Sequence, residues 1–525
     1  MSKTQSSLPF DCSGLGRITA SAEFSASCEW NCSQLFNGNI EVRCKLTKGE
    51  LAKLRAAAIV ADKALELSSE ERNLTFEGQT ADGGTLRLDS VDFVLSPTES
   101  ELVFHVAEAL WSRNTGNVPS HLVFHLVNHE ISAVPSTSVV LPSGFVAEGT
   151  LISLQLLNGL AYLRAVDNQD DIIDSLEESG GVAVTTDFFL PICRQEDLDA
   201  SLKIAHHLCC VLTLLSGNRI NWISYSMVAA DGSIIVAGAQ NTVTRSYQKT
   251  DLVNTLSDRK VQLRISGTTS ALIISRMMER FQYQEEKWNL VAIINSFHEA
   301  ISSGHFFEQQ GQLLANCVEM LRQSYLQNGG NEFVLPTIEF EGKQKALIKG
   351  VKKLLNEQFP EAEGWTKEQR DEHRAKLSQM ATHIKGANRY GFKHALIEIA
   401  DELKMFSQEV CESLQEKPDP RGFLAPLRLD PADAENEASK ADVMSDALTC
   451  SIRAFVDIRD CLTHQGRFLV PPVDEDSEWT SRRINEERYK QERFMERFVA
   501  AFLTTILGWH QPLPTPPILY KANVS

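Results

Sequence analysis

The hydrophobic pattern of the chain changes its period near residue 280, and this change constrains the fold more than any other feature. Before it, several short segments such as 39–44 and 120–127 show rough alternation of apolar and polar residues, the period of half-buried β-strands. After Arg280, apolar residues recur every three or four positions nearly to the end, which is typical of amphipathic helices. The sequence therefore predicts an α+β protein of several domains, β-rich in its N-terminal half and all-α in its C-terminal half.

Turn signals and strand-like segments fill the first half of the chain. The tripeptide Asp-Gly-Gly at 82–84 is a hairpin turn signal, because glycine adopts the positive φ that such turns need. Residues 197–216 carry apolar residues at helical spacing and predict a helix, and residues 221–237 predict a second hairpin that turns at 230–232. Further strands are predicted at 16–24, 39–44, 73–77, 102–105, 120–127 and 150–156, and a helix at 51–66.

These patterns divide the chain into four parts. Residues 1–190 form a β-rich N-terminal domain, and the helix and hairpin within 191–280 belong to the same unit. Residues 281–510 form the helical domain. Residues 511–525 are a tail, because the segment Gln511-Pro-Leu-Pro-Thr-Pro-Pro forms neither a helix nor a central strand. Within the helical domain, loops are predicted at 329–330, 360–364 and 418–433.

Length and composition place the chain among ordinary globular proteins. Its 525 residues suffice for roughly two to four domains, and 43% hydrophobic with 23% charged residues is a usual balance. The eleven cysteines show no disulfide framework of the secreted type. We find no basic-then-apolar leader and no apolar run long enough to span a bilayer. We therefore expect a cytoplasmic protein without a membrane partner.

The net charge limits how the chain meets nucleic acid. A formal charge of −18 argues against a protein that coats nucleic acid without specificity, but it is compatible with an enzyme that has a local basic groove. The most basic stretch lies in the helical half, where four lysines share one helical face and further basic residues follow, among them Arg370, Arg374 and Lys385. Solvated helix faces usually look like this as well. The candidate RNA contacts are Lys345, Lys349, Lys352, Lys353, Arg389 and Lys393.

One C-terminal segment combines a buried helical stripe with an arginine and a histidine. Arg459 falls on the apolar stripe, where a guanidinium is costly to bury and must be paired or directed into a site. His464 follows in the last turn before Gly466, a helix C-cap, where the helix dipole favours a cation. A fixed cation beside an acid/base group suits chemistry on phosphodiesters. The apolar stripe consists of Leu448, Ile452, Phe455 and Leu462.

The segment Val456-Asp-Ile-Arg-Asp-Cys-Leu-Thr-His464 resembles the Arg-polar-x3-His signature of HEPN domains. Its flanks resemble the ApeA-type HEPN of bacterial abortive-infection proteins, and residues 305–325 resemble the long helix that opens that domain. The resemblance covers roughly residues 281–510, and the helix and hairpin within 191–280 resemble the preceding region only loosely. Asp460 stands where many relatives carry asparagine.

The resemblance implies an all-helical module that dimerises and cleaves RNA, transfer RNA among the candidates, without metal or another cofactor. Arg459 then stabilises the phosphorane and His464 transfers protons, while Asp460, four residues before His464, orients the imidazole. Because one chain offers one of each group, two motifs facing across a two-fold axis supply two. The resemblance also implies an antiphage effector whose N-terminal half senses a trigger, such as a phage-derived protein.

Two other interpretations stay open at this stage. In the first, Arg459 forms a structural ion pair with an acidic residue such as Glu319, His464 is an incidental cap, and the module is a catalytically silent HEPN scaffold that binds RNA or protein. In the second, the protein is an enzyme of another type with its site in the N-terminal half. No nucleotide-binding GxxxxGK[ST] loop, dinucleotide GxGxxG, GxSxG elbow or HExxH is present to support the second.

Two groups of metal-ligand residues are weaker than they look. His121, His125 and His129 would share one face of a helix, but their valine-rich surroundings favour a strand, where residues four apart are separated by about 13 Å. The pair Cys28 and Cys32 has a tolerable zinc-knuckle spacing. The second pair that would complete a strong signal is missing, so Cys12, Cys28, Cys32 and Cys44 are only a candidate zinc set.

Overall fold

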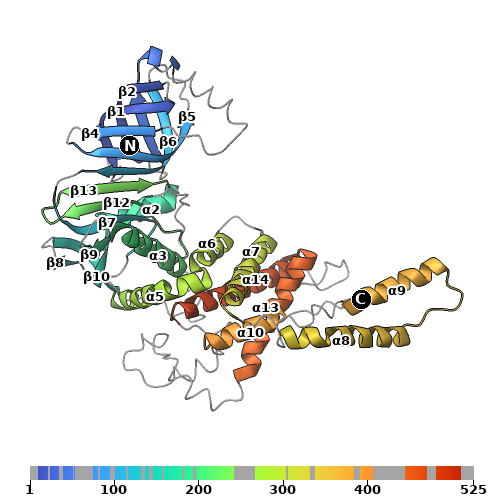
Figure 1. Ribbon diagram of the computed structural model, residues 1–525. Coiled ribbons are helices and arrows are strands. Elements are labelled where there is room, and N and C mark those ends of the chain that lie inside the picture. The colour runs from blue at the N-terminus through green and yellow to red at the C-terminus, as the bar shows by residue number, and fades with distance from the viewer. Residues whose placement is uncertain are drawn as a thin grey trace, which may run out of the picture. The chain divides into compact units, whose positions relative to one another are not determined.

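The computed structural model separates into two compact units, Met1–Tyr283 and Gln284–Ser525 (Figure 1). The sequence analysis placed the division at residue 281. Nearly all of the helix predicted at 51–66, the loop at 418–433 and the tail at 511–525 lie outside the described residues. The structure describes residues 10–21, 24–34, 39–50, 52–53, 75–80, 83–94, 101–113, 116–131, 136–140, 146–156, 159–179, 183–192, 197–241, 267–302, 306–330, 337–382, 391–405, 444–469 and 481–509.

Six antiparallel strands of the first unit close into a barrel. The strands form two consecutive three-stranded meanders, β1–β2–β3 and β4–β5–β6, and the pairings β1 with β4 and β3 with β6 join them into a ring. Because the ring is closed, each of the six strands pairs with a neighbouring strand on both of its edges over at least part of its length. The strands are β1 Asp11–Ser21, β2 Phe24–Gln34, β3 Ile40–Lys45, β4 Thr75–Thr80, β5 Thr85–Val94 and β6 Glu101–Ser112.

Strand β6 belongs both to the barrel and to an open sheet. Its residues 101–106 pair with β3, and its residues 108–112 pair with β13 along the same edge, while β5 pairs with its other edge. The open part of the sheet continues in the order β13–β12–β7–β11–β10–β9–β8 (Figure 1). Its strands are β7 Pro119–Val127, β8 Ser136–Val140, β9 Val146–Leu156, β10 Gly159–Ala165, β11 Val184–Pro191, β12 Asn221–Ala229 and β13 Ile234–Gln240.

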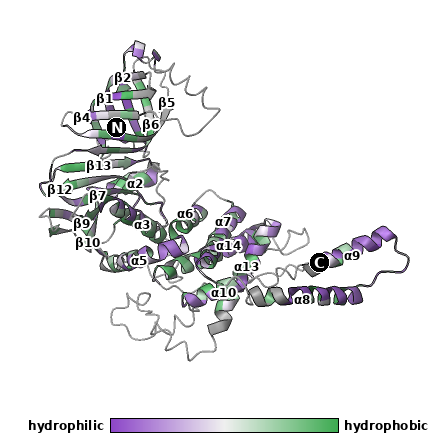
Figure 2. Ribbon diagram, viewed as in Figure 1, coloured by the Kyte–Doolittle hydropathy of each residue, from purple (hydrophilic) through white to green (hydrophobic). Residues whose placement is uncertain are grey.

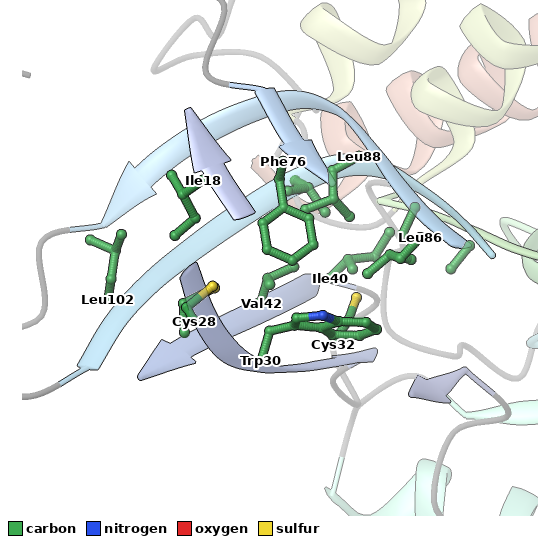
Figure 3. Packing of buried hydrophobic residues seen from close by; sticks show 14 of the residues in the cluster. Ile18, Cys28, Trp30, Cys32, Ile40, Val42, Phe76, Leu86, Leu88 and Leu102 are labelled. Atoms are coloured by element: carbon green, nitrogen blue, oxygen red, sulfur yellow. The ribbon is translucent and has the colours of Figure 1, made fainter. Parts of the chain in front are cut away.

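Large apolar side chains fill the barrel interior. Trp30 and Phe76 contact each other edge to face with ring centroids 5.8 Å apart. A Cβ at Gly78 would lie 2.7 Å from the Trp30 ring, so only glycine leaves room for the indole at this position. Figure 3 shows Ile18, Ile40 and Val42 with Trp30 and Phe76 in this interior.

Helices cover part of the open sheet. Helix α3 (Leu198–Ser216) packs against β12 and β7, and helix α2 (Gln169–Ser179) packs against β11. The predicted end of α3 is confirmed, because Gly217 has a φ of 75° and its N–H donates to the carbonyl of Thr213. Helix α5 (Gly267–Trp288) meets α3 through the rings of His207 and Phe281, 4.5 Å apart. The uninterrupted series of helices in the described chain thus begins at Gly267, before the predicted residue 280.

Helix α3 corrects the expectation that the chain has no apolar run long enough to span a bilayer. It is the one helix among the described residues that is long and apolar enough to cross a membrane, with a mean hydropathy of 1.4 over its best window. In the first unit, 61% of that window is buried, and Figure 2 colours the α3 ribbon largely as hydrophobic. Burial against the sheet accounts for this hydropathy, because a helix that is covered on most sides is apolar on most sides.

A charged ladder crosses three strands of the open sheet. Asp187 on β11 lies in register with His125 on β7 and with Arg164 on β10. Its carboxylate bonds the Nδ1 of His125 at 2.8 Å and the guanidinium of Arg164. Burial alone would raise the pKa of Asp187, but the hydrogen bond and charge of His125 and the charge of Arg164 outweigh burial and lower it.

We predict that Asp187→Asn lowers the free energy of unfolding by about 1–3 kcal/mol at pH 7, because a buried carboxylate that bonds His125 and Arg164 is lost. A lowered folded-state pKa stabilises the fold above the ordinary value of 3.8, and this contribution disappears as the pH falls through the lowered pKa. The difference from the wild type should therefore shrink in acid. Urea unfolding followed by circular dichroism at pH 7 and pH 3 measures it.

The matched control for this prediction is Glu148→Gln, which removes an exposed carboxylate from β9 of the same sheet. It should change the free energy of unfolding by less than about 0.5 kcal/mol at either pH. A constant difference between wild type and Asp187→Asn across the pH range contradicts the role of the charge.

The described part of the second unit is helical. Helices α6, α7, α10, α13 and α14 pack together, whereas α8 packs against α9. Phe498 of α14 stacks on Phe455 of α13 with centroids 4.3 Å apart and contacts Phe494 and Phe502 of its own helix. The helices are α6 Leu290–Ile301, α7 Phe307–Gln327, α8 Thr337–Gln358, α9 Lys367–Thr382, α10 Phe392–Glu402, α13 Met444–Gln465 and α14 Ser481–Ile506.

Candidate functional site on helix α13

Helix α13 carries the arginine and the histidine of the sequence motif. Its apolar stripe is buried at Ile452, Phe455 and Leu462, as the helical spacing predicts. The helix ends at Gly466, whose φ of 66° and N–H bond to the carbonyl of Leu462 at 3.0 Å confirm the predicted C-cap. Arg459 and His464 therefore lie in the last two turns of a helix whose other face is fixed in the core.

Arg459 is held from three elements. Its Nη1 donates to Asp460 Oδ1 at 2.7 Å, and its Nη2 lies 3.8 Å from Glu319 Oε2 of α7. The guanidinium also lies over the ring of Phe392 at the start of α10, 4.6 Å from the centroid. The side chain keeps 24% of its surface exposed. A guanidinium held in this way has a defined orientation and still reaches solvent.

The ion pair between Arg459 and Glu319, the structural alternative considered from the sequence, is present but long. Glu319 Oε1 instead accepts a hydrogen bond from Nη1 of Arg322 at 2.7 Å, one turn further along α7. Its other oxygen, Oε2, is buried and accepts no hydrogen bond from the described residues. Asp460 is therefore the stronger partner of Arg459, and Glu319 adds charge without a hydrogen bond.

His464 is exposed, and it makes no hydrogen bond or ion pair with the described residues. The hydrogen bond expected between Asp460 and His464 is not formed. The carboxylate of Asp460 instead accepts a hydrogen bond from Arg459. Arg459 and His464 are five residues apart, which places them about 140° apart around the helix axis. One chain thus presents the two groups on different sides of the same helix end.

Two contacts hold the end of α13 in place. At Gly311 of α7, a Cβ would lie 2.8 Å from both Leu462 Cδ1 and Phe468 Cζ, so the two helices approach closely where α13 ends. Beyond the helix, the side-chain amide of Gln491 on α14 donates to the carbonyl of Leu469 at 2.8 Å and accepts its N–H at 3.0 Å. Neither residue can be identified from the sequence pattern, because both act through packing and backbone bonds across helices.

The described candidates for RNA contact lie on two helices, α8 and α10. Helix α8 carries Lys345, Lys349 and Lys353 exposed and Lys352 half-buried, and it packs against α9. Lys393 directly follows Phe392, the residue of α10 whose ring contacts Arg459. Arg389 lies outside the described residues.

The described residues form no metal centre. Among them, no three His, Cys, Asp or Glu side chains lie together in a way that could hold a metal ion. His121 and His125 lie on strand β7, as predicted, and burial lowers the pKa of His121 and His129 to about 4. The cysteines at 12, 28, 32 and 44 line the barrel strands β1, β2 and β3 without forming a four-ligand set.

Comparisons with known proteins leave the chain without an assigned family. No family model matches it, and no curated protein or solved structure matches it.

We predict that Gly311→Ala destabilises the second unit by about 1–3 kcal/mol, because the new methyl group overlaps Leu462 and Phe468 where α7 meets α13. Gly350→Ala is the matched control: this glycine lies on α8, and a Cβ there meets nothing within 4 Å. The control should be neutral or stabilising by up to about 1 kcal/mol, since alanine favours a helix. Chemical denaturation of both variants tests this, and equal effects at the two positions would count against the close packing.

Proposed function

We propose that the protein is a metal-independent endoribonuclease of the HEPN type, with Arg459 and His464 as its catalytic residues. The observation that carries the proposal is the end of α13, where Arg459 is oriented by Asp460 and Phe392 while His464 stays exposed five residues later. The described part of the second unit is helical, which agrees with the all-α module that the resemblance implies.

The two side chains suit cleavage by the RNA's own 2'-hydroxyl. That reaction needs a base for the hydroxyl proton, an acid for the leaving 5'-oxygen and a cation for the pentacoordinate phosphorane. Arg459 supplies a permanent positive charge, and His464 exchanges protons. Because the two groups lie about 140° apart on one helix, we propose that two chains face each other across a two-fold axis, each contributing an arginine and a histidine.

The proposal extends to the biological setting that the resemblance implies. The protein then acts in the cytoplasm as a toxin-like effector of abortive infection, with the first unit restraining the nuclease until a trigger such as a phage protein binds. The barrel and open sheet of that unit offer many strand-connecting segments, which are the usual positions of binding loops. Lys393, which follows Phe392 in the chain, is a candidate for an RNA backbone contact.

A second candidate function rests on the charges around Arg459. Asp460 at 2.7 Å and Glu319 at 3.8 Å surround the guanidinium with two carboxylates, as a structural ion-pair network does. In that case the module is a catalytically silent scaffold that binds RNA or protein. The two functions differ in whether purified protein cuts RNA.

We predict that Arg459→Ala and His464→Ala each reduce RNA cleavage by roughly 10²–10⁴-fold, because one removes charge stabilisation and the other proton transfer. Arg453→Ala and Gln465→Ala are matched controls, since both residues are exposed on the same helix. The controls should cleave RNA like the wild type, and all four variants should keep their helical circular dichroism. If both catalytic variants retain wild-type activity, the protein is not this nuclease; if the wild type cuts no RNA, the scaffold is favoured.

We also predict that cleavage persists in EDTA and leaves a 2',3'-cyclic phosphate on the 5' fragment. Asp460, the carboxylate next to Arg459, is already bonded to that cation, and the described residues offer no metal-binding cluster. A substrate with a 2'-deoxy group at the scissile nucleotide should be inert, because it lacks the nucleophile. Mass spectrometry of the products measures both. Loss of activity in EDTA, or equal cutting of the 2'-deoxy substrate, contradicts the roles given to Arg459 and His464.

A further inference from the structure

Two cysteines of the barrel lie directly opposite each other on neighbouring strands. Cys12 of β1 pairs with Cys32 of β2 in the antiparallel register. Two residues away, the N–H of Gln34 donates to the carbonyl of Phe10 at 3.0 Å, so Phe10 and Gln34 form a hydrogen-bonded pair. Hydrogen-bonded and non-hydrogen-bonded pairs alternate along an antiparallel ladder, so Cys12 and Cys32 also occupy a hydrogen-bonded pair position. The Cα atoms at such positions are about 5.5 Å apart, within the range of a disulfide, and the Cβ atoms, also about 5.5 Å apart, must approach by about 1 Å for the bond to form.

The two thiols differ in access. Cys32 is fully buried, and Figure 3 shows it in the barrel interior beside Trp30. Cys12 is only half-buried, close to the N-terminal end of β1. Their thiols are hydrogen-bonded to each other, and this contact together with burial raises the pKa of Cys32 well above its ordinary value. A reagent in solution therefore reaches Cys12 first, while Cys32 stays a protonated thiol in contact with it.

A second cysteine pair in the same barrel provides an internal comparison. The thiols of Cys28 and Cys44 are also hydrogen-bonded, but both residues are buried, at 5% and 0% exposure. Cys44 is directly opposite Trp30, so Cys28 lies on the diagonal. Diagonal Cα atoms are about 7–8 Å apart, at or beyond the limit for a disulfide. This pair lacks both the entry point and the geometry of the first.

We propose that Cys12 and Cys32 are a reversible redox site that closes to a disulfide on reaction with a low-molecular-weight disulfide. The Cys12 sulfur, as thiolate, attacks the reagent, forms a mixed disulfide and releases one reagent thiol. The Cys32 sulfur then attacks the Cys12 sulfur, and its proton goes to the second reagent thiol as it leaves. Two protein thiols are oxidised to one disulfide, and the reagent disulfide is reduced to two thiols. The product links β1 covalently to β2.

The experiment incubates the native full-length protein with oxidised glutathione, blocks remaining thiols in acid and maps the peptides by mass spectrometry. Cleavage after Arg17, Glu29 and Arg43 places the four barrel cysteines in four different peptides. The expected result is one linked pair, the Cys12 peptide joined to the Cys32 peptide, which a dithiol reductant separates.

Two controls make the test specific. Cys450 is a free, exposed cysteine on α13, and it should keep a glutathione adduct in the same sample. The Cys32→Ser variant should also keep one glutathione, on Cys12, because the resolving thiol is gone. Cys28 and Cys44 should remain unlinked.

Three outcomes overturn the proposal: wild-type Cys12 keeps its glutathione, Cys12 stays unmodified while Cys450 reacts, or the link forms through Cys28 or Cys44. The site is independent of the proposed nuclease, since the assay reads sulfur chemistry and requires no RNA. Failure of one therefore leaves the other standing.

Discussion

The first unit depends on the divided pairing of a single strand. Strand β6 gives its first half to β3, which closes the barrel, and its second half to β13, which begins the open sheet. The apolar interior is continuous across this junction, because Ala109 of β6 and Ala239 of β13 lie in register and belong to the barrel core. Gln34 at the end of β2 donates to the carbonyls of Ile223 and Gln240 and ties the barrel to the same junction. A barrel and a sheet that share a strand, a core and these bonds form one structural body.

Much of this architecture is encoded in local patterns. Strands β3, β7 and β12, the helix α3 and the cap at Gly217 follow from period, turn signals and glycine. Strand β11 does not, because its interior residues are buried on both faces and show no alternation. The sequence pattern does not predict strand β2, because its inward positions hold cysteines and a tryptophan. The spacing of Cys28 and Cys32 is typical of a metal knuckle, but it fits two inward positions of one strand equally well.

Some features of the candidate site depend on the α13 segment alone, and others depend on how distant helices pack against it. The helix, its buried stripe and its C-cap at Gly466 are properties of one segment, so the sequence predicts them. The partners of Arg459 depend on how α7 and α10 approach α13, and no spacing along the chain encodes that approach. Asp460 shows the limit clearly: its position four residues before His464 suggested an imidazole partner, whereas its carboxylate bonds the adjacent guanidinium.

The carboxylates around Arg459 do not by themselves prevent it from binding a phosphate. A guanidinium has five N–H donors; the bond to Asp460 uses one, and Glu319 at 3.8 Å lies beyond hydrogen-bond distance. Phe392 covers part of the guanidinium face, which leaves its in-plane donors as the route for an incoming oxygen. A phosphate that bonds these donors need not displace Asp460, and Asp460 keeps the guanidinium oriented while it binds. The same ion pair is therefore compatible with a structural and with a catalytic arginine, and what separates the two is whether a second chain brings a histidine to the phosphate.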